Sequence, residues 1–171
     1  DYNTTLDATK MPNTESNNFL TPIGMNFKSW YYKVGDEKVE FDVSKPVMSD
    51  LELYADYNFK KHKISFDKND NDATMTYTDT IEVEYTGVIG QELLSQLFQD
   101  VVIRESWLPT KPGWVCTGWY LDEKGTKPVF LIKGENYEIS AAAKMPNENK
   151  TLYAGWRPKE FKLSLNPNGG K

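Results

Sequence analysis

The segment "TLYAGW" at residues 151–156 decides how this sequence is organised, because a similar segment, "LELYADY", stands at residues 51–57. The offset of 99 residues between their last aromatic residues also relates "KISF" at 63–66 to "KLSL" at 162–165. Apolar and polar side chains alternate in these segments, which is typical of β-strands with one buried face. A pattern that returns at one long offset indicates tandem duplication. We therefore expect a chain built from repeated, β-rich units.

A second set of matches has an offset of 89 residues. The difference of ten residues between the two offsets predicts an insertion after Phe130, in the segment "KGENYEISAA" at 133–142. A loop can absorb such an insertion because the entropic cost of closing it grows only logarithmically with its length. The matched pairs at the shorter offset are Gly24 with Gly113, Trp30 with Trp119, and Phe41 with Phe130.

The two offsets divide the chain into three parts. Residues 1–59 are expected to be a truncated first repeat unit, residues 60–158 a complete unit, and residues 159–171 the opening strand of a further unit. Residues 1–18 fit no clear part of this pattern. Because the sequence opens without methionine and stops within the pattern, we expect it to be a fragment of a longer protein.

The complete unit is expected to have an α+β fold, mostly β, in the order strand-strand-helix-strand-strand. Alternating apolar residues predict strands at 62–67 and 75–85, joined by the polar turn "DKNDND" at 67–72. After Gly90, an apolar stripe of helical period at 93–101, with polar residues from Gln91 onward on the opposite face, predicts one amphipathic helix of about three turns. Short strands follow at 114–121, 128–132 and 151–156. One helix across the face of a single sheet is a β-grasp-like arrangement.

Composition limits the classes of function. The chain has 171 residues, 39% of them hydrophobic and 13% aromatic, which is enough to form a hydrophobic core. A net charge of −5 without a basic run argues against nucleic acid as a partner. No apolar run is long enough for membrane insertion of this segment. The single cysteine, Cys116, excludes an internal disulfide.

Three motifs together resemble a known family. They are "LSLNPNGG" at 163–170, "PGWVCTGWY" at 112–120 and "KTLYAGW" at 150–156. The family is the Listeria–Bacteroides repeat, also called the internalin B-repeat family, and the sequence resembles it fully over residues 61–157 and in part over 18–59. The resemblance implies β-grasp-type repeats in secreted or wall-anchored bacterial surface proteins, between an adhesive head and the cell envelope.

On this basis we expect a non-enzymatic tandem-repeat segment of a bacterial cell-surface protein, which acts as a stalk or spacer and supports adhesion. The expected localisation is extracellular, in a secreted or cell-wall-anchored parent protein. The alternative is a binding module whose units themselves recognise a glycan or a host protein through exposed aromatic side chains. Expected partners are neighbouring repeats, a host-cell protein or glycan, and a cell-wall polymer. No cofactor is expected.

Trp107 and Trp114 are the candidate ligand-binding residues. They lie near prolines and outside the duplicated strands, so an exposed patch is the natural hypothesis for them. Packing is favoured instead for the aromatic residues that recur at the repeat offsets, because buried rings remove large apolar areas from water. These residues are Trp119, Tyr120, Tyr153 and Trp156.

No catalytic or metal-binding residues are expected. His62 is the only histidine, which argues against a histidine-rich metal site, and no serine sits in a nucleophile-elbow pattern. Cys116 stands 89 residues after Phe27, which favours a buried apolar role for its thiol. The polar turn begins like a calcium loop but has Asp72 where that loop needs glycine and Thr78 where it needs glutamate.

Overall fold

The structure is a computed structural model and describes residues 4, 5, 7, 9, 11, 12, 21–97, 106–166, 168 and 169. The chain divides into two compact units, Asp1–Lys61, here called unit 1, and His62–Lys171, called unit 2. Strands predominate, and the described residues define one short helix, α1, at Ile89–Leu97. The predicted mostly-β composition is therefore confirmed.

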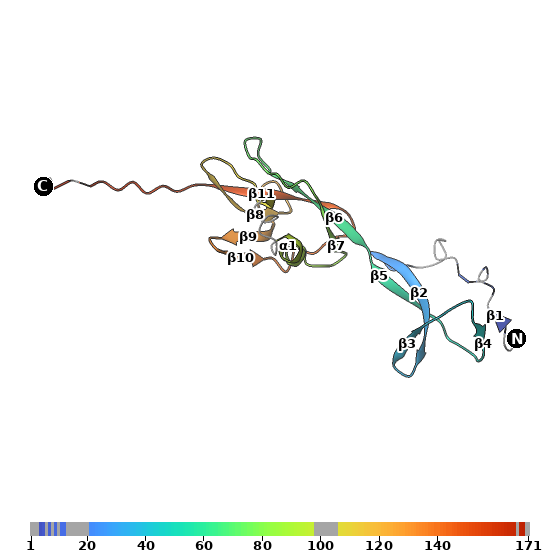
Figure 1. The fold of residues 1–171 in the computed structure, drawn as a ribbon. Coiled ribbons are helices and arrows are strands. Elements are labelled where there is room, and N and C mark those ends of the chain that lie inside the picture. The colour runs from blue at the N-terminus through green and yellow to red at the C-terminus, as the bar shows by residue number, and fades with distance from the viewer. Residues whose placement is uncertain are drawn as a thin grey trace. The chain divides into compact units, whose positions relative to one another are not determined.

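Unit 1 is built on a three-stranded antiparallel sheet in the order β3-β2-β5 (Figure 1). The turn between β2 and β3 contains Gly35, whose φ of 62° suits a residue without a side chain. The strands β1 and β4 form a separate antiparallel pair. The bounds are β1 Thr4–Thr5, β2 Met25–Val34, β3 Glu37–Glu40, β4 Pro46–Val47 and β5 Tyr54–Phe59.

The aromatic side chains of unit 1 cluster without full burial. The ring centroid of Phe27 lies 5.4 Å from that of Trp30 and 6.3 Å from that of Tyr57. All three residues are half-buried. Within the described ranges, every fully buried hydrophobic side chain belongs to unit 2. Because stabilisation scales with the apolar area removed from water, unit 1 gains less from burial than unit 2.

Unit 2 contains a six-stranded sheet in the order β10-β9-β8-β11-β6-β7 (Figure 1). The inner strand β11 pairs in parallel with β6 and antiparallel with β8. This places the last strand of the unit between its first strand and the strand that carries Trp119. The bounds are β6 Lys61–Asp67, β7 Ile81–Glu84, β8 Trp114–Tyr120, β9 Pro128–Lys133, β10 Asn136–Ile139 and β11 Lys150–Pro158.

The core of unit 2 combines the apolar stripe of α1 with an aromatic centre. Ile89, Leu93 and Leu97 recur at helical spacing and are buried. They join the buried sheet residues in one cluster. At its centre, the ring centroid of Trp119 lies 5.0 Å from that of Phe66. The predicted packing role of Trp119 agrees with this complete burial.

The two units share a backbone register. In unit 1 the paired residues are Met25 with Phe59, Asn26 with Asn58, Phe27 with Tyr57, Ser29 with Asp56, Trp30 with Ala55, and Tyr31 with Tyr54. In unit 2 they are Trp114 with Pro158, Val115 with Arg157, Cys116 with Trp156, Gly118 with Gly155, Trp119 with Ala154, and Tyr120 with Tyr153. Each pair of unit 1 recurs at the sequence offsets of 89 and 99, and both ladders shift register at the same point.

The predicted strand at 75–85 is wrong in extent, because β7 covers only Ile81–Glu84. The residues before β7 bond instead to the segment after α1. The Tyr77 N–H donates to the carbonyl oxygen of Ser106 at 3.1 Å, and Thr74 and Thr110 exchange two backbone hydrogen bonds of 2.8 Å. The alternation of apolar residues with a period of two therefore indicated which side chains face the core. It did not indicate which backbone segments pair with each other.

Two other boundaries differ from the prediction. The helix begins at Ile89, two residues before the predicted start near Gln91, and its predicted extension beyond Leu97 lies outside the described residues. The insertion at 133–142 was expected to be a loop but contains β10. This strand pairs antiparallel with β9 and forms one edge of the sheet, so the extra residues satisfy their backbone groups in a hairpin.

Candidate functional site

Trp107 does not lie at the surface. Its side chain is fully buried, and its ring stacks on that of Trp119 at a centroid distance of 5.6 Å. The rings of Phe66 and Phe130 meet it edge-on at 5.8 and 5.5 Å. The expectation that Trp107 contributes to an exposed patch is therefore wrong. Substitution of Trp107 would therefore disturb the packing of the core and not an exposed contact with a ligand.

Trp114, the other candidate, lies at the start of β8 with 36% of its surface exposed. The Lys111 ammonium is 4.5 Å from the centre of its ring, which is a cation–π contact. The same ammonium lies 2.5 Å from a carboxylate oxygen of Asp70. We call Asp70, Lys111 and Trp114 the Trp114 cluster. Ligand binding at Trp114 stays a prediction.

Two loops bring the Trp114 cluster together. Asp70 comes from the turn after β6, and Lys111 from the segment before β8. The hydrogen bond from Lys111 contributes most to lowering the pKa of Asp70, and the bond from the Asp72 N–H adds to it. An aromatic ring beside a fixed ion pair offers a stacking surface with hydrogen-bonding groups, which suits a polyhydroxylated ligand. The sequence analysis did not identify Asp70 and Lys111 as neighbours of Trp114, although it did predict the polar turn that contains Asp70.

A shallow pocket of about 280 Å³ opens beside Tyr120 and Trp156. The Tyr120 ring lies across Gly155, where a Cβ would meet the ring at 2.2 Å. The Trp156 Nε1–H donates to the carbonyl oxygen of Lys68 at 2.9 Å, and the hydroxyls of Thr117 and Tyr120 hydrogen-bond at 3.1 Å. Both aromatic side chains are thus held by contacts within unit 2, as the packing hypothesis requires.

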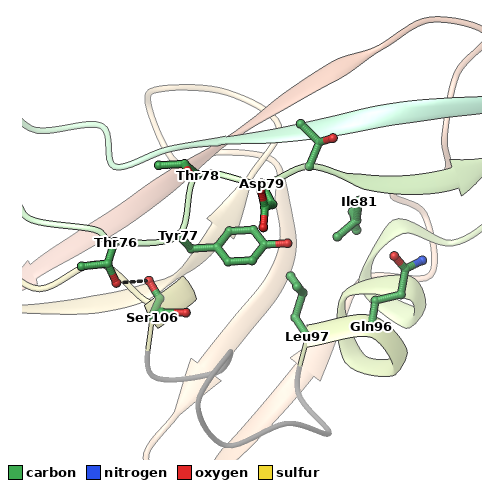
Figure 2. A pocket seen from close by; sticks show the side chains of 9 residues that line it. Thr76, Tyr77, Thr78, Asp79, Ile81, Gln96, Leu97 and Ser106 are labelled. Carbon is green, nitrogen blue, oxygen red and sulfur yellow. Dashed lines mark hydrogen bonds between the residues drawn. The ribbon is translucent and has the colours of Figure 1, made fainter.

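A second pocket, of about 370 Å³, lies between residues 76–81 and α1 (Figure 2). Its lining residues are Thr76, Tyr77, Thr78, Asp79, Thr80, Ile81, Gln96, Leu97 and Ser106. Burial raises the pKa of Tyr77, and the Asp79 carboxylate adds to the effect. The lining offers hydroxyl, carboxylate and amide groups for binding.

The remaining reactive side chains are held by the fold. Burial raises the pKa of the Cys116 thiol to about 11, so it is protonated at neutral pH and a poor nucleophile. His62 Nε2 lies 2.9 Å from Asn147 Oδ1. Over the residues that the structure describes, no group of three or more His, Cys, Asp or Glu side chains could hold a metal ion. No helix among these same residues is long and apolar enough to cross a membrane.

The polar turn after β6 is closed by its own side chains. The Lys68 ammonium donates to the carbonyl oxygens of Asn71 and Ala73 at 3.2 and 2.6 Å. The Asp67 carboxylate accepts the Asn69 N–H at 2.7 Å. An ammonium therefore occupies the oxygen-rich side of the turn, where it would repel a divalent cation. These contacts favour a structural turn.

Comparison with known proteins identifies the family. Residues 2–56 match the sequence model of the Listeria-Bacteroides repeat domain. Internalin H of Listeria monocytogenes is 34% identical over 151 residues, which cover 86% of this chain and 21% of that protein. An Evansella cellulosilytica protein whose name describes a Gly-rich membrane protein is 26% identical over 159 residues, covering 88% of this chain and 16% of its own length. No solved structure matches the chain.

The chain spans between 16% and 21% of the length of these two relatives. The matched residues 2–56 lie in unit 1, whereas the sequence motifs predicted a full resemblance over residues 61–157 and a partial one over 18–59. The similarity to Internalin H covers 86% of the chain and so extends into both units. The chain thus carries a Listeria-Bacteroides repeat domain at residues 2–56, and this is the family that its repeated motifs predict.

Proposed function

We propose that this chain is a non-enzymatic tandem-repeat segment of a bacterial cell-surface protein and acts as an extracellular stalk or spacer that supports adhesion. The main support is the backbone register shared by β2 with β5 and by β8 with β11. The Trp114 cluster, by contrast, does not recur, since Pro22 and Met25 stand at the counterparts of Lys111 and Trp114. What the units share is therefore packing geometry, which serves a spacer.

In this proposal the parts 1–59, 60–158 and 159–171 are successive repeats, and the complete one is β-grasp-like. Its α1 packs with the sheet in one core, as that arrangement requires. The similarity to Internalin H and to a named membrane protein supports a surface location. Host-cell proteins, glycans or wall polymers would then be partners of the parent protein.

A spacer needs repeats whose ends are fixed on their own sheets. The Lys60 N–H donates to the carbonyl oxygen of Gly24 at 2.8 Å, and the Lys159 N–H donates to that of Gly113 at the same distance. Each bond ties the end of one unit to the start of its sheet. Short, tied connections restrict how far successive repeats can reorient.

Spin labels on Asp36→Cys and Lys124→Cys, in a Cys116→Ser background, test this restriction by electron paramagnetic resonance. The distance distribution between the labels is expected to be narrow. Lys60→Pro removes the N–H donor and is expected to broaden the distribution, whereas Lys60→Ala keeps the N–H and leaves it narrow. If the distance distribution were equally broad with and without the Lys60→Pro substitution, the result would contradict the spacer mechanism.

A second candidate function is recognition of a glycan or host protein by the units themselves. The observation that favours it is the Trp114 cluster, with a partly exposed ring beside an ion pair. A glycan array with the whole chain tests it. Saturable binding that Trp114→Ala abolishes, with the fold intact, would favour recognition over a passive spacer. Phe161→Ala is the matched control, because that ring is exposed but outside the Trp114 cluster and should leave binding unchanged.

A further inference from the structure

The first and last strands of the unit 2 sheet, β6 and β11, lie side by side and run in the same direction (Figure 1). The chain enters this sheet at Lys61 and leaves it at Pro158. Lys61 precedes the paired part of β6, and Pro158 follows the paired part of β11. The entry and the exit therefore lie at opposite ends of one parallel strand pair. The paired residues are Ile64 with Lys150, Ser65 with Thr151, Phe66 with Leu152, and Asp67 with Tyr153.

This arrangement determines how tension along the chain acts on unit 2. A pull on Lys61 and Pro158 moves β6 and β11 in opposite directions along their own axes. The main-chain hydrogen bonds of a parallel ladder are evenly spaced along the strands, so such a pull loads them together. Separation of the two strands then requires several bonds to break at once, and not one after another.

Side-chain hydrogen bonds add to the ladder on the side where the chain enters. The Lys63 N–H donates to Asn149 Oδ1 at 2.8 Å, and the hydroxyls of Ser65 and Thr151 hydrogen-bond at 3.0 Å. Both bonds join residues that are 86 apart in the sequence, which is the separation of the paired backbone residues. The same pull therefore loads these bonds and the ladder.

Two further bonds join the turn after β6 to β11 on the side where the chain leaves. The Asn69 side-chain amide donates to the carbonyl oxygen of Ala154 at 3.0 Å, and the Trp156 Nε1–H donates to that of Lys68 at 2.9 Å. Both bonds are partly buried, and a hydrogen bond is electrostatically stronger there than in water. We call residues 62–69 and 149–156, with the bonds between them, the shear clamp.

The core opposes sliding of one strand of the clamp along the other. Ile64 and Leu152 are fully buried, and the ring of Phe66 lies 5.0 Å from that of Trp119 and 5.8 Å from that of Trp107. Because successive side chains of a strand point to opposite faces, a slip by one residue would turn Ile64 and Phe66 away from the core. The displacement that breaks the ladder therefore also exposes buried apolar surface.

We propose that the shear clamp resists force and keeps unit 2 folded while tension passes along the chain from Lys61 to Pro158. Resistance of this kind is a rate property, because forced unfolding is governed by the rate of unfolding. The use of the clamp rests on the proposed stalk function, since a stalk that supports adhesion transmits pull between the surfaces it connects. The clamp itself depends only on the strand order and contacts of unit 2.

The other neighbour of β11 provides a comparison within the same sheet. β8 pairs with β11 antiparallel, and Trp114 lies beside Pro158 at the end of this ladder. A pull on Pro112 and Glu160 draws the adjoining ends of β8 and β11 apart, so the hydrogen bonds break one after another from that end. Because Glu160 is the point of pulling in both cases, the comparison isolates the direction of the load.

Single-molecule force spectroscopy on the whole chain tests the proposal. Handles on Lys61→Cys and Glu160→Cys, in a Cys116→Ser background, load the clamp in shear. Handles on Pro112→Cys and Glu160→Cys, in the same background, pull β8 from β11. At equal loading rates the unfolding force is expected to be severalfold higher in the shear geometry. Equal forces in the two geometries, or a lower force in shear, overturn the proposal.

A pair of variants separates the clamp from general stability. Asn149→Ala with Thr151→Val removes two side-chain bonds of the clamp and is expected to lower the unfolding force in shear, with little change in the other geometry. Thr126→Ala is the matched control, because it removes a hydroxyl bond of 2.6 Å to Asp122 between β8 and β9. Urea denaturation measures the stability of each. An unchanged shear force in the clamp variant, or an equal decrease in the control, overturns the proposal.

Failure of the clamp and failure of the spacer give different results. Equal unfolding forces in the two pulling geometries would remove the clamp and leave the distance distribution between the spin labels as it is. A broad distance distribution would contradict the spacer mechanism, whereas the direction dependence of the unfolding force within unit 2 would remain.

Discussion

A side chain on Gly118 would place its Cβ 2.0 Å from the carbonyl oxygen of Phe130 on the neighbouring strand. Gly118 also has a φ of 135°, which L-residues rarely adopt. Its counterpart in unit 1 is Ser29, at the same point of the shared register shift. The close approach is therefore a feature of unit 2, where β9 packs against β8 beside the buried Trp119.

Gly118→Ala is expected to destabilise unit 2 by about 3 kcal/mol or more, because backbone must move to relieve the clash. Gly113→Ala is the matched control. Gly113 has a φ of 76°, but a methyl group on its Cα would meet no atom within 4 Å, so only conformational strain of about 1 kcal/mol is expected. Urea denaturation followed by tryptophan fluorescence measures both. Equal losses for the two variants would contradict the packing argument.

Cys116 is expected to react slowly with thiol reagents. Burial raises its pKa from the ordinary 9.0 to about 11, so the thiolate fraction near pH 8 falls by roughly 100-fold. Because the folded thiol holds its proton more tightly, this group's contribution to stability is complete below pH 9 and is lost as the pH rises toward 11. The rate of labelling by a disulfide reagent, with and without denaturant, measures the effect. Similar rates in both conditions would contradict it.

Unit 1 is expected to open more readily than unit 2. Its sheet carries half-buried rings such as Trp30, whereas unit 2 buries a continuous core around Trp119. Local stability follows the buried apolar contacts of each region. Hydrogen exchange with mass spectrometry is expected to show faster exchange in β2 and β5 than in β8 and β11. The reverse order would show that unit 1 is stabilised by something other than core burial.

The sequence located the strands that use the duplicated register. The predicted strands at 114–121, 128–132 and 151–156 end within two residues of β8, β9 and β11. This is possible because the alternation of side chains is a local consequence of a pleated strand with one buried face. The offsets also marked Trp30 and residues 51–57 as counterparts of these strands, whereas the pairing of β2 with β5 comes from the structure.

The features that sequence reasoning missed depend on contacts between distant residues. Trp107 is buried by Trp119 and Phe130, and nothing in its own segment distinguishes a ring that points inward from one that points outward. Asp70 and Lys111 meet across 41 residues. Neither feature has a counterpart at the repeat offsets, so the comparison that revealed the strands could not reveal them.

The two matched tryptophans provide the last prediction. Trp119→Ala is expected to cost about 3–5 kcal/mol, because it removes a fully buried ring and leaves a cavity beside Trp107 and Phe66. Trp30→Ala, at the same register position of unit 1, is expected to cost about 1–2 kcal/mol, since that ring is only half-buried. Hydrogen exchange within each unit assigns each loss to its own sheet.

Phenylalanine substitutions at the same positions separate loss of volume from loss of the ring. Trp119→Phe keeps an aromatic contact with Phe66 and is expected to recover much of the stability lost in Trp119→Ala. Trp30→Phe is expected to differ little from the unaltered chain. If Trp30→Ala lost as much stability as Trp119→Ala, unit 1 would have a core of its own beyond the contacts of Phe27 and Tyr57. The expectation that unit 1 is less stable than unit 2 would then be wrong.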